Sequence, residues 1–117
     1  MSLEHYLKIK FYFNFGIHIK GKDMDKKKDK RLIEALDNII ILNDNYAEQG
    51  IKKGYVGTVI ENLIDEMGIM LVDFIEPYTG NDIKILAEIK ADDCRYISID
   101  NDEDKKLGMA FREMFNR

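Results

Sequence analysis

A glycine-rich stretch runs directly into β-branched residues between positions 50 and 63, where the sequence reads GIKKGYVGTVIENL. Gly50, Gly54 and Gly57 precede Val59 and Ile60. Glycine adopts positive φ easily and lets two backbones approach closely, so this spacing predicts a tight loop that shapes a hairpin. The stretch therefore predicts one strand, from about residue 56 to 63, and the turn before it.

Other short strand-like segments lie close to this hairpin in the sequence. They are residues 39–42, 68–76, 83–90 and 95–99, separated by turn residues and by Pro77. Several short strands at such close spacing are typical of a small β-barrel. The chain has 117 residues and no internal repeats or linkers, so we expect a single domain over residues 1–117.

The most regular alternation lies near the N-terminus, in the segment LKIKFYFNFGIHIK at residues 7–20. Every second residue is a large apolar one, which predicts a long strand with one buried face. A strand of this length is expected to bend or bulge at Gly16. The pattern leaves open whether the strand pairs within the chain or across a dimer.

Two helices are expected outside the strand-rich region. The first covers about residues 25–37, with Asp23 or Asp25 as its N-cap and with apolar residues at helical spacing at Leu32, Ile33 and Leu36. The second covers about residues 100–117, with Asn101 or Asp102 as its N-cap. Its predicted buried stripe consists of Leu107, Ala110, Phe111, Met114 and Phe115.

The order of strand, glycine loop and strand resembles the first hairpin of SH3-like barrels, and in particular the KOW-type pattern. In QGIKKGYVG an apolar residue, a basic residue and Gly54 precede Gly57 and a β-branched residue. Over residues 36–99 the chain resembles an uncharacterised bacterial family of small SH3-like domains. The shared features are the Gly-x-x-x-Gly-x-x-Gly-Thr-Val hairpin, the strand containing Val72-Asp73-Phe74 and the Asp92-Asp93-x-Arg95 link.

This resemblance implies an α+β fold, built on an SH3-like, partly open antiparallel β-barrel. The N-terminal strand and helix (residues 1–35) and the C-terminal helix (residues 100–117) are then additions packed on the barrel (residues 36–99).

The charge is distributed unevenly along the chain. The net charge is −4, yet residues 20–31 carry a net +4, so the remaining residues carry −8. The acidic residues are densest from Asp92 to Asp104. A protein gains affinity for nucleic acid when its Lys and Arg side chains release the counterions bound to the phosphates. The acidic net charge therefore disfavours nucleic-acid binding outside the one basic stretch.

Several kinds of chemistry find little support in the residues. Cys94 is the sole cysteine, which excludes an internal disulfide and a cysteine zinc site and favours the reducing cytoplasm. The sequence shows neither a signal-peptide pattern nor an apolar run of the about 20 residues that a membrane helix needs. Asp100, Asp102 and Asp104 match the start of a calcium loop, but Lys105 and Phe111 occupy positions that need Gly and Glu. His5, His18 and Cys94 form no recognisable catalytic motif, so neither enzyme activity nor a metal or cofactor is expected.

A small acidic cytoplasmic domain without catalytic residues has the profile of an immunity protein or antitoxin. Nuclease toxins are basic because they hold phosphates, and an acidic partner can cover that surface. The layout is also similar to that of contact-dependent-inhibition immunity proteins. The candidate anchors are Tyr46, Tyr55 and Tyr78, and the candidate contact acids are Asp73, Glu76, Asp92, Asp93, Asp100, Asp102, Glu103 and Asp104.

The KOW-like hairpin supports an alternative function, an RNA- or ribosome-associated module. Lys52 and Lys53 would contact phosphates, and Tyr55 would stack on a base. The two hypotheses require binding surfaces of opposite charge: an acidic surface for toxin binding and a basic loop for RNA binding.

Overall fold

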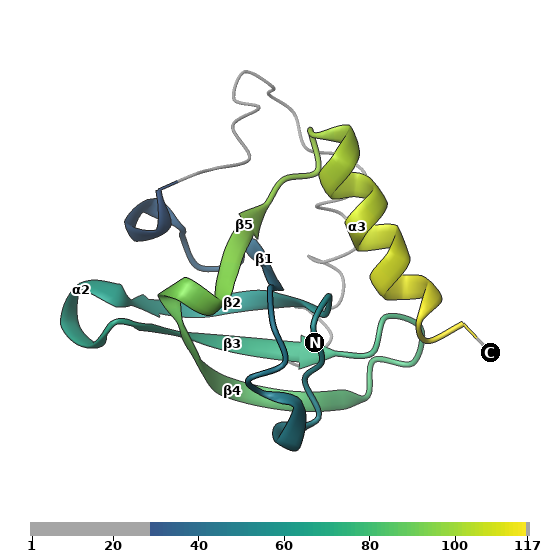
Figure 1. The fold of residues 1–117 in the computed structure, drawn as a ribbon, viewed down its shortest axis with the longest axis horizontal. Coiled ribbons are helices and arrows are strands. Elements are labelled where there is room, and N and C mark those ends of the chain that lie inside the picture. The colour runs from purple at the N-terminus through teal and green to yellow at the C-terminus, as the bar shows by residue number, and fades with distance from the viewer. Residues whose placement is uncertain (1–28, 117) are drawn as a thin grey trace.

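The computed structural model describes residues 29–116, which form an α+β structure around one antiparallel sheet (Figure 1). Its elements in chain order are η1 (Lys30–Leu32), β1 (Asn38–Ile41), η2 (Ala47–Gln49), β2 (Val56–Leu63), α2 (Ile64–Met67), β3 (Ile69–Ile75), β4 (Asp82–Lys90), η3 (Ala91–Asp93), β5 (Cys94–Ile97) and α3 (Asp102–Glu113).

The five strands lie in the order β4-β3-β2-β1-β5, and every neighbouring pair is antiparallel. Within residues 29–116, β4 and β5 are the two edges and do not pair with each other. The predicted α+β class and antiparallel sheet are therefore confirmed, and the described sheet remains open.

The glycines of the opening stretch have the roles that their spacing predicts. Gly50 and Gly54 have φ of +87° and +91° in the loop between β1 and β2. Gly57 lies within β2, where an added Cβ would lie 2.6 Å from Val72 Cγ1 and 2.7 Å from Phe74 Cε1. Only glycine allows β2 to lie this close to those side chains of β3.

The core is formed mainly by the strands and the loop before β2, and Phe111 joins it from α3. All four residues of β1 are buried, and Val59, Val72, Phe74 and Ile89 join them from the other strands. α3 crosses from the end of β5 toward the β3–β4 hairpin (Figure 1). An aromatic cluster holds it there, because the Tyr55 ring lies 5.3 Å from Phe111 and 5.5 Å from Phe115, centroid to centroid.

The predicted helix over residues 25–37 is wrong for its described part, residues 29–37. Only the 3-10 turn Lys30–Leu32 forms there, and Leu36 has a φ of +75°. Leu36 N donates to Val59 O at 2.7 Å, and Val59 N donates to Asp37 O at 2.9 Å. Because these groups bond to β2, they cannot form the i to i−4 bonds of an α-helix. The predicted strand over residues 7–20 and residues 25–28 of the helix lie outside the described residues.

The C-terminal helix is confirmed, with Asn101 as its N-cap accepting from Asp104 N at 3.0 Å. Its predicted buried stripe is only partly right. Phe111 is buried and Phe115 is partly buried, but Leu107, Ala110 and Met114 are exposed. The helix instead turns Asp104 and Gly108 inward along with Phe111, because bonds from β5 hold the Asp104 carboxylate inside.

Candidate partner-binding surface

Asp104 is a structural residue at the start of α3. Its side chain is fully buried, with Oδ1 accepting from Arg95 Nη2 at 2.8 Å and Oδ2 accepting from Ser98 N at 2.8 Å. A buried carboxylate must be paired in this way, since an unpaired charge is costly to remove from water. Asp104 therefore joins α3 to β5 and does not reach the surface.

Asp93 is the centre of a second network, between η3 and the loop after β1. Its carboxylate accepts from Tyr46 Oη at 2.6 Å, from Asn43 Nδ2 at 2.9 Å and from Asn45 Nδ2 at 3.2 Å. Tyr46 Oη in turn accepts from Lys90 N at 2.9 Å. The hydrogen bond from Tyr46, with help from both asparagines, lowers the pKa of Asp93. Burial and the Asp93 carboxylate together raise the pKa of Tyr46 to about 12.

Asp73 supports a bulge between β3 and β4. Its Oδ1 accepts from Leu86 N at 2.8 Å, and Leu86 has a φ of +55° at a point where the register shifts. The side chain is buried, and this burial raises the pKa of Asp73. Three of the eight acids predicted to bind a partner therefore serve the fold.

The other five acids lie at three separate places. Glu76 is at the β3–β4 hairpin and Asp92 is in η3, while Asp100, Asp102 and Glu103 lie together at the start of α3. η3 and the start of α3 stand at opposite ends of β5 (Figure 1). The fold thus brings three of the predicted acids into one group and keeps Asp92 and Glu76 apart from it.

The residues of the RNA-binding alternative do not form a common surface. Lys52 and Lys53 are exposed on the loop before β2. The Tyr55 ring, however, packs against Phe111 and Phe115 inside the aromatic cluster and leaves only 8% of the residue accessible. Because a base needs an accessible ring face for stacking, Tyr55 does not offer one in this conformation.

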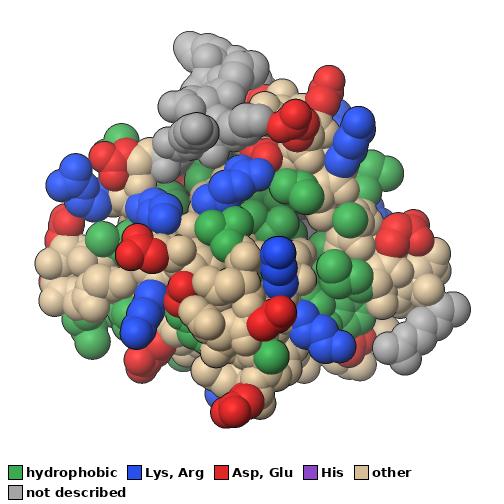
Figure 2. Space-filling view, viewed as in Figure 1, with side chains coloured by type: hydrophobic (Ala, Val, Ile, Leu, Met, Phe, Trp, Pro, Cys, Tyr) green, Lys and Arg blue, Asp and Glu red, His purple; other side chains and the backbone are tan. Residues whose placement is uncertain are grey.

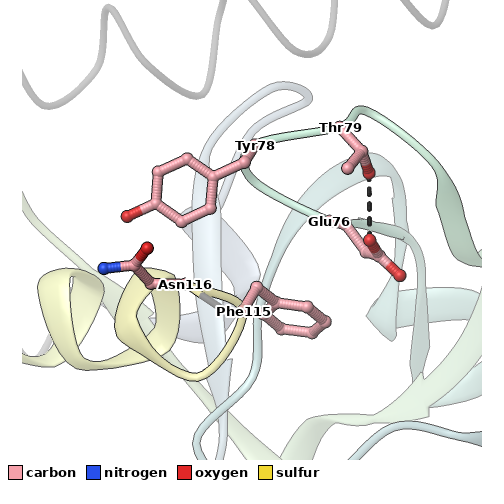
Figure 3. Close-up of a pocket in the computed structure, with 5 residues that line it drawn as sticks. All are labelled: Glu76, Tyr78, Thr79, Phe115 and Asn116. Carbon is pink, nitrogen blue, oxygen red and sulfur yellow. Dashed lines mark hydrogen bonds between the residues drawn. The ribbon is translucent and has the colours of Figure 1, made fainter.

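Of the three candidate anchors, Tyr78 alone is exposed, at 47%, while Tyr46 and Tyr55 are buried. Tyr78 stands between two pockets where the β3–β4 hairpin meets the end of α3. The first has a volume of about 410 Å³ and is lined by Glu76, Tyr78, Thr79, Phe115 and Asn116 (Figure 3). The second has a volume of about 220 Å³ and is lined by Tyr78, Met109, Arg112 and Glu113.

Two side chains of α3 lie beside this tyrosine. Met109 is exposed and lines the second pocket, and the Arg112 guanidinium carbon lies 5.5 Å from the Tyr78 ring centroid. In the space-filling view, hydrophobic side chains reach the surface along α3 and beside it, among charged ones (Figure 2). We call Tyr78, Met109, Arg112 and the other residues that line the two pockets the Tyr78 surface. Sequence reasoning missed Met109 and Arg112 and placed Met114 inward, because the helix is rotated by the burial of Asp104.

Cys94 and the potential metal ligands are the remaining chemical candidates of the sequence. Cys94 is buried, with Sγ 3.8 Å from Lys90 O and from Ala91 O, and burial raises the pKa of its thiol to about 12. No three His, Cys, Asp or Glu side chains between residues 29 and 116 are placed to hold a metal ion. His5 and His18 lie outside this range.

No helix in residues 29–116 has both the length and the apolar character needed to cross a membrane. Comparison of the chain with protein-family models, with curated proteins and with solved structures finds no match.

Proposed function

We propose that this chain is a non-catalytic protein-binding domain of the immunity or antitoxin type, which neutralises a basic, nuclease-like partner. The observation that carries the proposal is the exposure of Tyr78 between two pockets, with the exposed Met109 lining one of them. Tyrosine, arginine and methionine are enriched in protein interfaces, and energetically dominant contacts cluster around such anchors. Exposed apolar side chains gathered beside pockets are typical of a surface that another protein covers.

The charge of the described residues supports a basic partner. Residues 29–116 hold 10 Lys or Arg and 19 Asp or Glu, a net charge of −9. Within a chain of net charge −4, this acidic part attracts a basic protein and increases its association rate. In the proposed mechanism the Tyr78 surface anchors the partner. Exposed acids then pair with the Lys and Arg that the partner uses to hold phosphate, so that its nucleic-acid substrate is excluded.

We also propose that the sheet is an SH3-like barrel that is left partly open. The order β4-β3-β2-β1-β5 is that of a meander in which the last strand returns beside the first. The one-turn link η3 between β4 and β5 supports the same interpretation. In this arrangement α3 packs across the opening as an addition to the barrel.

The test is co-expression of the chain with the product of the adjacent gene, followed by affinity purification. We expect a stoichiometric complex with one basic protein whose nuclease activity is suppressed. Tyr78→Ala should weaken the complex by roughly 30-fold, the effect of a hot-spot residue. Met67→Ala is the matched control, because Met67 is also exposed but lies in α2 at the other end of the sheet (Figure 1).

Two results would contradict the proposal. One is capture of RNA or ribosomal particles that is lost on changing Lys52 and Lys53 to alanine, which would support the RNA-binding alternative. The other is a complex that Tyr78→Ala and Met67→Ala weaken equally, which would move the interface away from Tyr78.

A further inference from the structure

We infer that the pocket between Glu76, Tyr78 and Phe115 receives an arginine side chain of the partner. This inference rests on the proposed binding function and adds the chemistry of the residue that the partner inserts. The pocket, with a volume of about 410 Å³, lies between the β3–β4 hairpin and the end of α3 (Figure 3).

The lining of the pocket matches a guanidinium group. Glu76 supplies a carboxylate, Tyr78 and Phe115 supply aromatic rings, and Thr79 and Asn116 supply neutral polar groups. None of these five residues is basic. Guanidinium groups pair with carboxylates and stack on aromatic rings, so one side chain can use both kinds of wall. An anion would meet a carboxylate and the negative faces of the rings, and is disfavoured.

The carboxylate is held in place before any ligand arrives. Thr79 Oγ1 donates to Glu76 Oε1 at 2.9 Å and also accepts from Asn81 N at 3.0 Å. The backbone of Glu76 is fixed in the same turn, because its N–H donates to Asn81 O at 2.8 Å and its carbonyl accepts from Gly80 N at 3.0 Å. Thr79 occupies one of the roughly four acceptor positions of a carboxylate, so Glu76 can accept further donors.

The aromatic walls are also preorganised. The Phe115 ring lies 5.5 Å from Tyr55 and 5.5 Å from Phe111, so the aromatic cluster holds it. Tyr78 already lies close to a guanidinium, that of Arg112, which lines the second pocket together with Glu113. The ring thus stands between a pocket that contains the chain's own arginine and a pocket whose described lining includes a carboxylate and no basic residue. A binding site that needs no rearrangement loses less entropy on binding.

The test uses N-acetyl-arginine methylamide as the probe and the citrulline analogue, a neutral isostere, as its control. Each is titrated into the full chain while the amide signals of residues 76–79 and 115–116 are followed by NMR. We expect saturable shifts of these signals with the arginine probe, and at least fivefold weaker binding of the citrulline probe. Glu76→Gln should weaken arginine binding about tenfold, since it removes a charge-assisted contact. Glu66→Gln, an exposed glutamate of α2, is the control for the change in net charge.

Several results would overturn the inference. Shifts confined to Asp100, Asp102 and Glu103 would place arginine binding at the start of α3, and equal binding of the two probes would exclude charge recognition. Pocket signals that shift on dilution of the protein alone would assign the site to a second copy. If the pocket signals shift when Lys26, Lys27 and Lys28 are changed to alanine in the absence of probe, the pocket would be assigned to the chain's own basic segment. Because the titration needs no partner, its failure would leave the proposed function standing if the co-purified complex still depends on Tyr78.

Discussion

The guanidinium of Arg95 in β5 lies 2.8 Å from the carboxylate of Asp104 in α3, and no part of Asp104 is accessible to water. The same carboxylate accepts from Ser98 N, so a single side chain joins the last strand to the last helix. The rotation of α3 follows from this pair. With Asp104 inward, Met109 is exposed on the Tyr78 surface.

Replacing Asp104 by asparagine should destabilise the fold by about 2–4 kcal/mol, because Arg95 loses its charged partner and a buried carboxylate acceptor is exchanged for an amide. The largest destabilisation seen on breaking a fully buried ion pair is not expected here. The Arg95 side chain is 29% exposed, so water screens the interaction. Urea unfolding measures the change. Asp102→Asn in the same helical turn is the control and should cost below about 1 kcal/mol. Equal effects of the two variants would show that the pair contributes little.

Tyr46→Phe should destabilise the fold by about 1–3 kcal/mol at neutral pH, because Lys90 N loses its acceptor and Asp93 loses its shortest donor. The effect should depend on pH. The folded-state pKa of Asp93 lies below its unfolded value of about 3.9, so this stabilisation is present above that value and is lost as pH falls through the folded pKa. Unfolding of both proteins between pH 7 and pH 2 should therefore show a difference that shrinks in acid. A constant difference would assign the loss to the bond from Lys90 N and not to the Asp93 carboxylate.

Asp73→Asn should leave the protein at least as stable as the original at pH 7, because the amide oxygen can still accept from Leu86 N while the buried charge is removed. The folded-state pKa of Asp73 is raised, so its ionised form opposes folding at high pH and this cost disappears as pH falls through the folded pKa. The difference in unfolding free energy between the asparagine variant and the original protein should therefore shrink as pH falls. Asp73→Ala lacks the acceptor and should cost about 1–2 kcal/mol. Urea unfolding in which asparagine and alanine behave alike would contradict this account of the bulge.

Gly57→Ala should destabilise the fold by about 1–3 kcal/mol, because the new methyl group would lie 2.6 Å from Val72 Cγ1. Combining it with Val72→Ala should recover part of the loss, which a double-mutant cycle measures. Gly50→Ala is the control. It meets no atom within 4 Å but keeps a φ of +87°, so its cost of about 1–2 kcal/mol should not depend on Val72. Simple additivity of Gly57→Ala and Val72→Ala would rule out the close contact as the cause.

Cys94 should react with a thiol reagent only after the protein opens, because its side chain is buried and its thiol pKa is raised to about 12. The rate of modification by Ellman's reagent should therefore rise with urea in step with unfolding. Rapid stoichiometric modification of the native protein would show that the thiol is accessible.

Patterns of neighbouring residues predicted much of this fold correctly. The glycine spacing predicted the loop between β1 and β2, because positive φ and close approach are local requirements. The cap of α3 was narrowed to Asn101 or Asp102 for the same kind of reason, since a cap bonds within its own helical turn, and the structure shows Asn101. The strand-like segment at residues 83–90 corresponds to β4, where Ala87 and Ile89 are buried at alternate positions.

The roles of the charged residues could not be obtained from such patterns. Asp93 and Asp104 belong to one acidic run in the sequence, yet Asp93 bonds to Tyr46, 47 residues away, and Asp104 bonds to Arg95. The helix expected over residues 25–37 failed for a related reason, because Leu36 and Asp37 bond to Val59 of β2. Local sequence determines which backbone conformations have low free energy. Only the tertiary structure decides which polar groups are buried together, because a buried charge or N–H group needs a partner that the rest of the chain must bring to it.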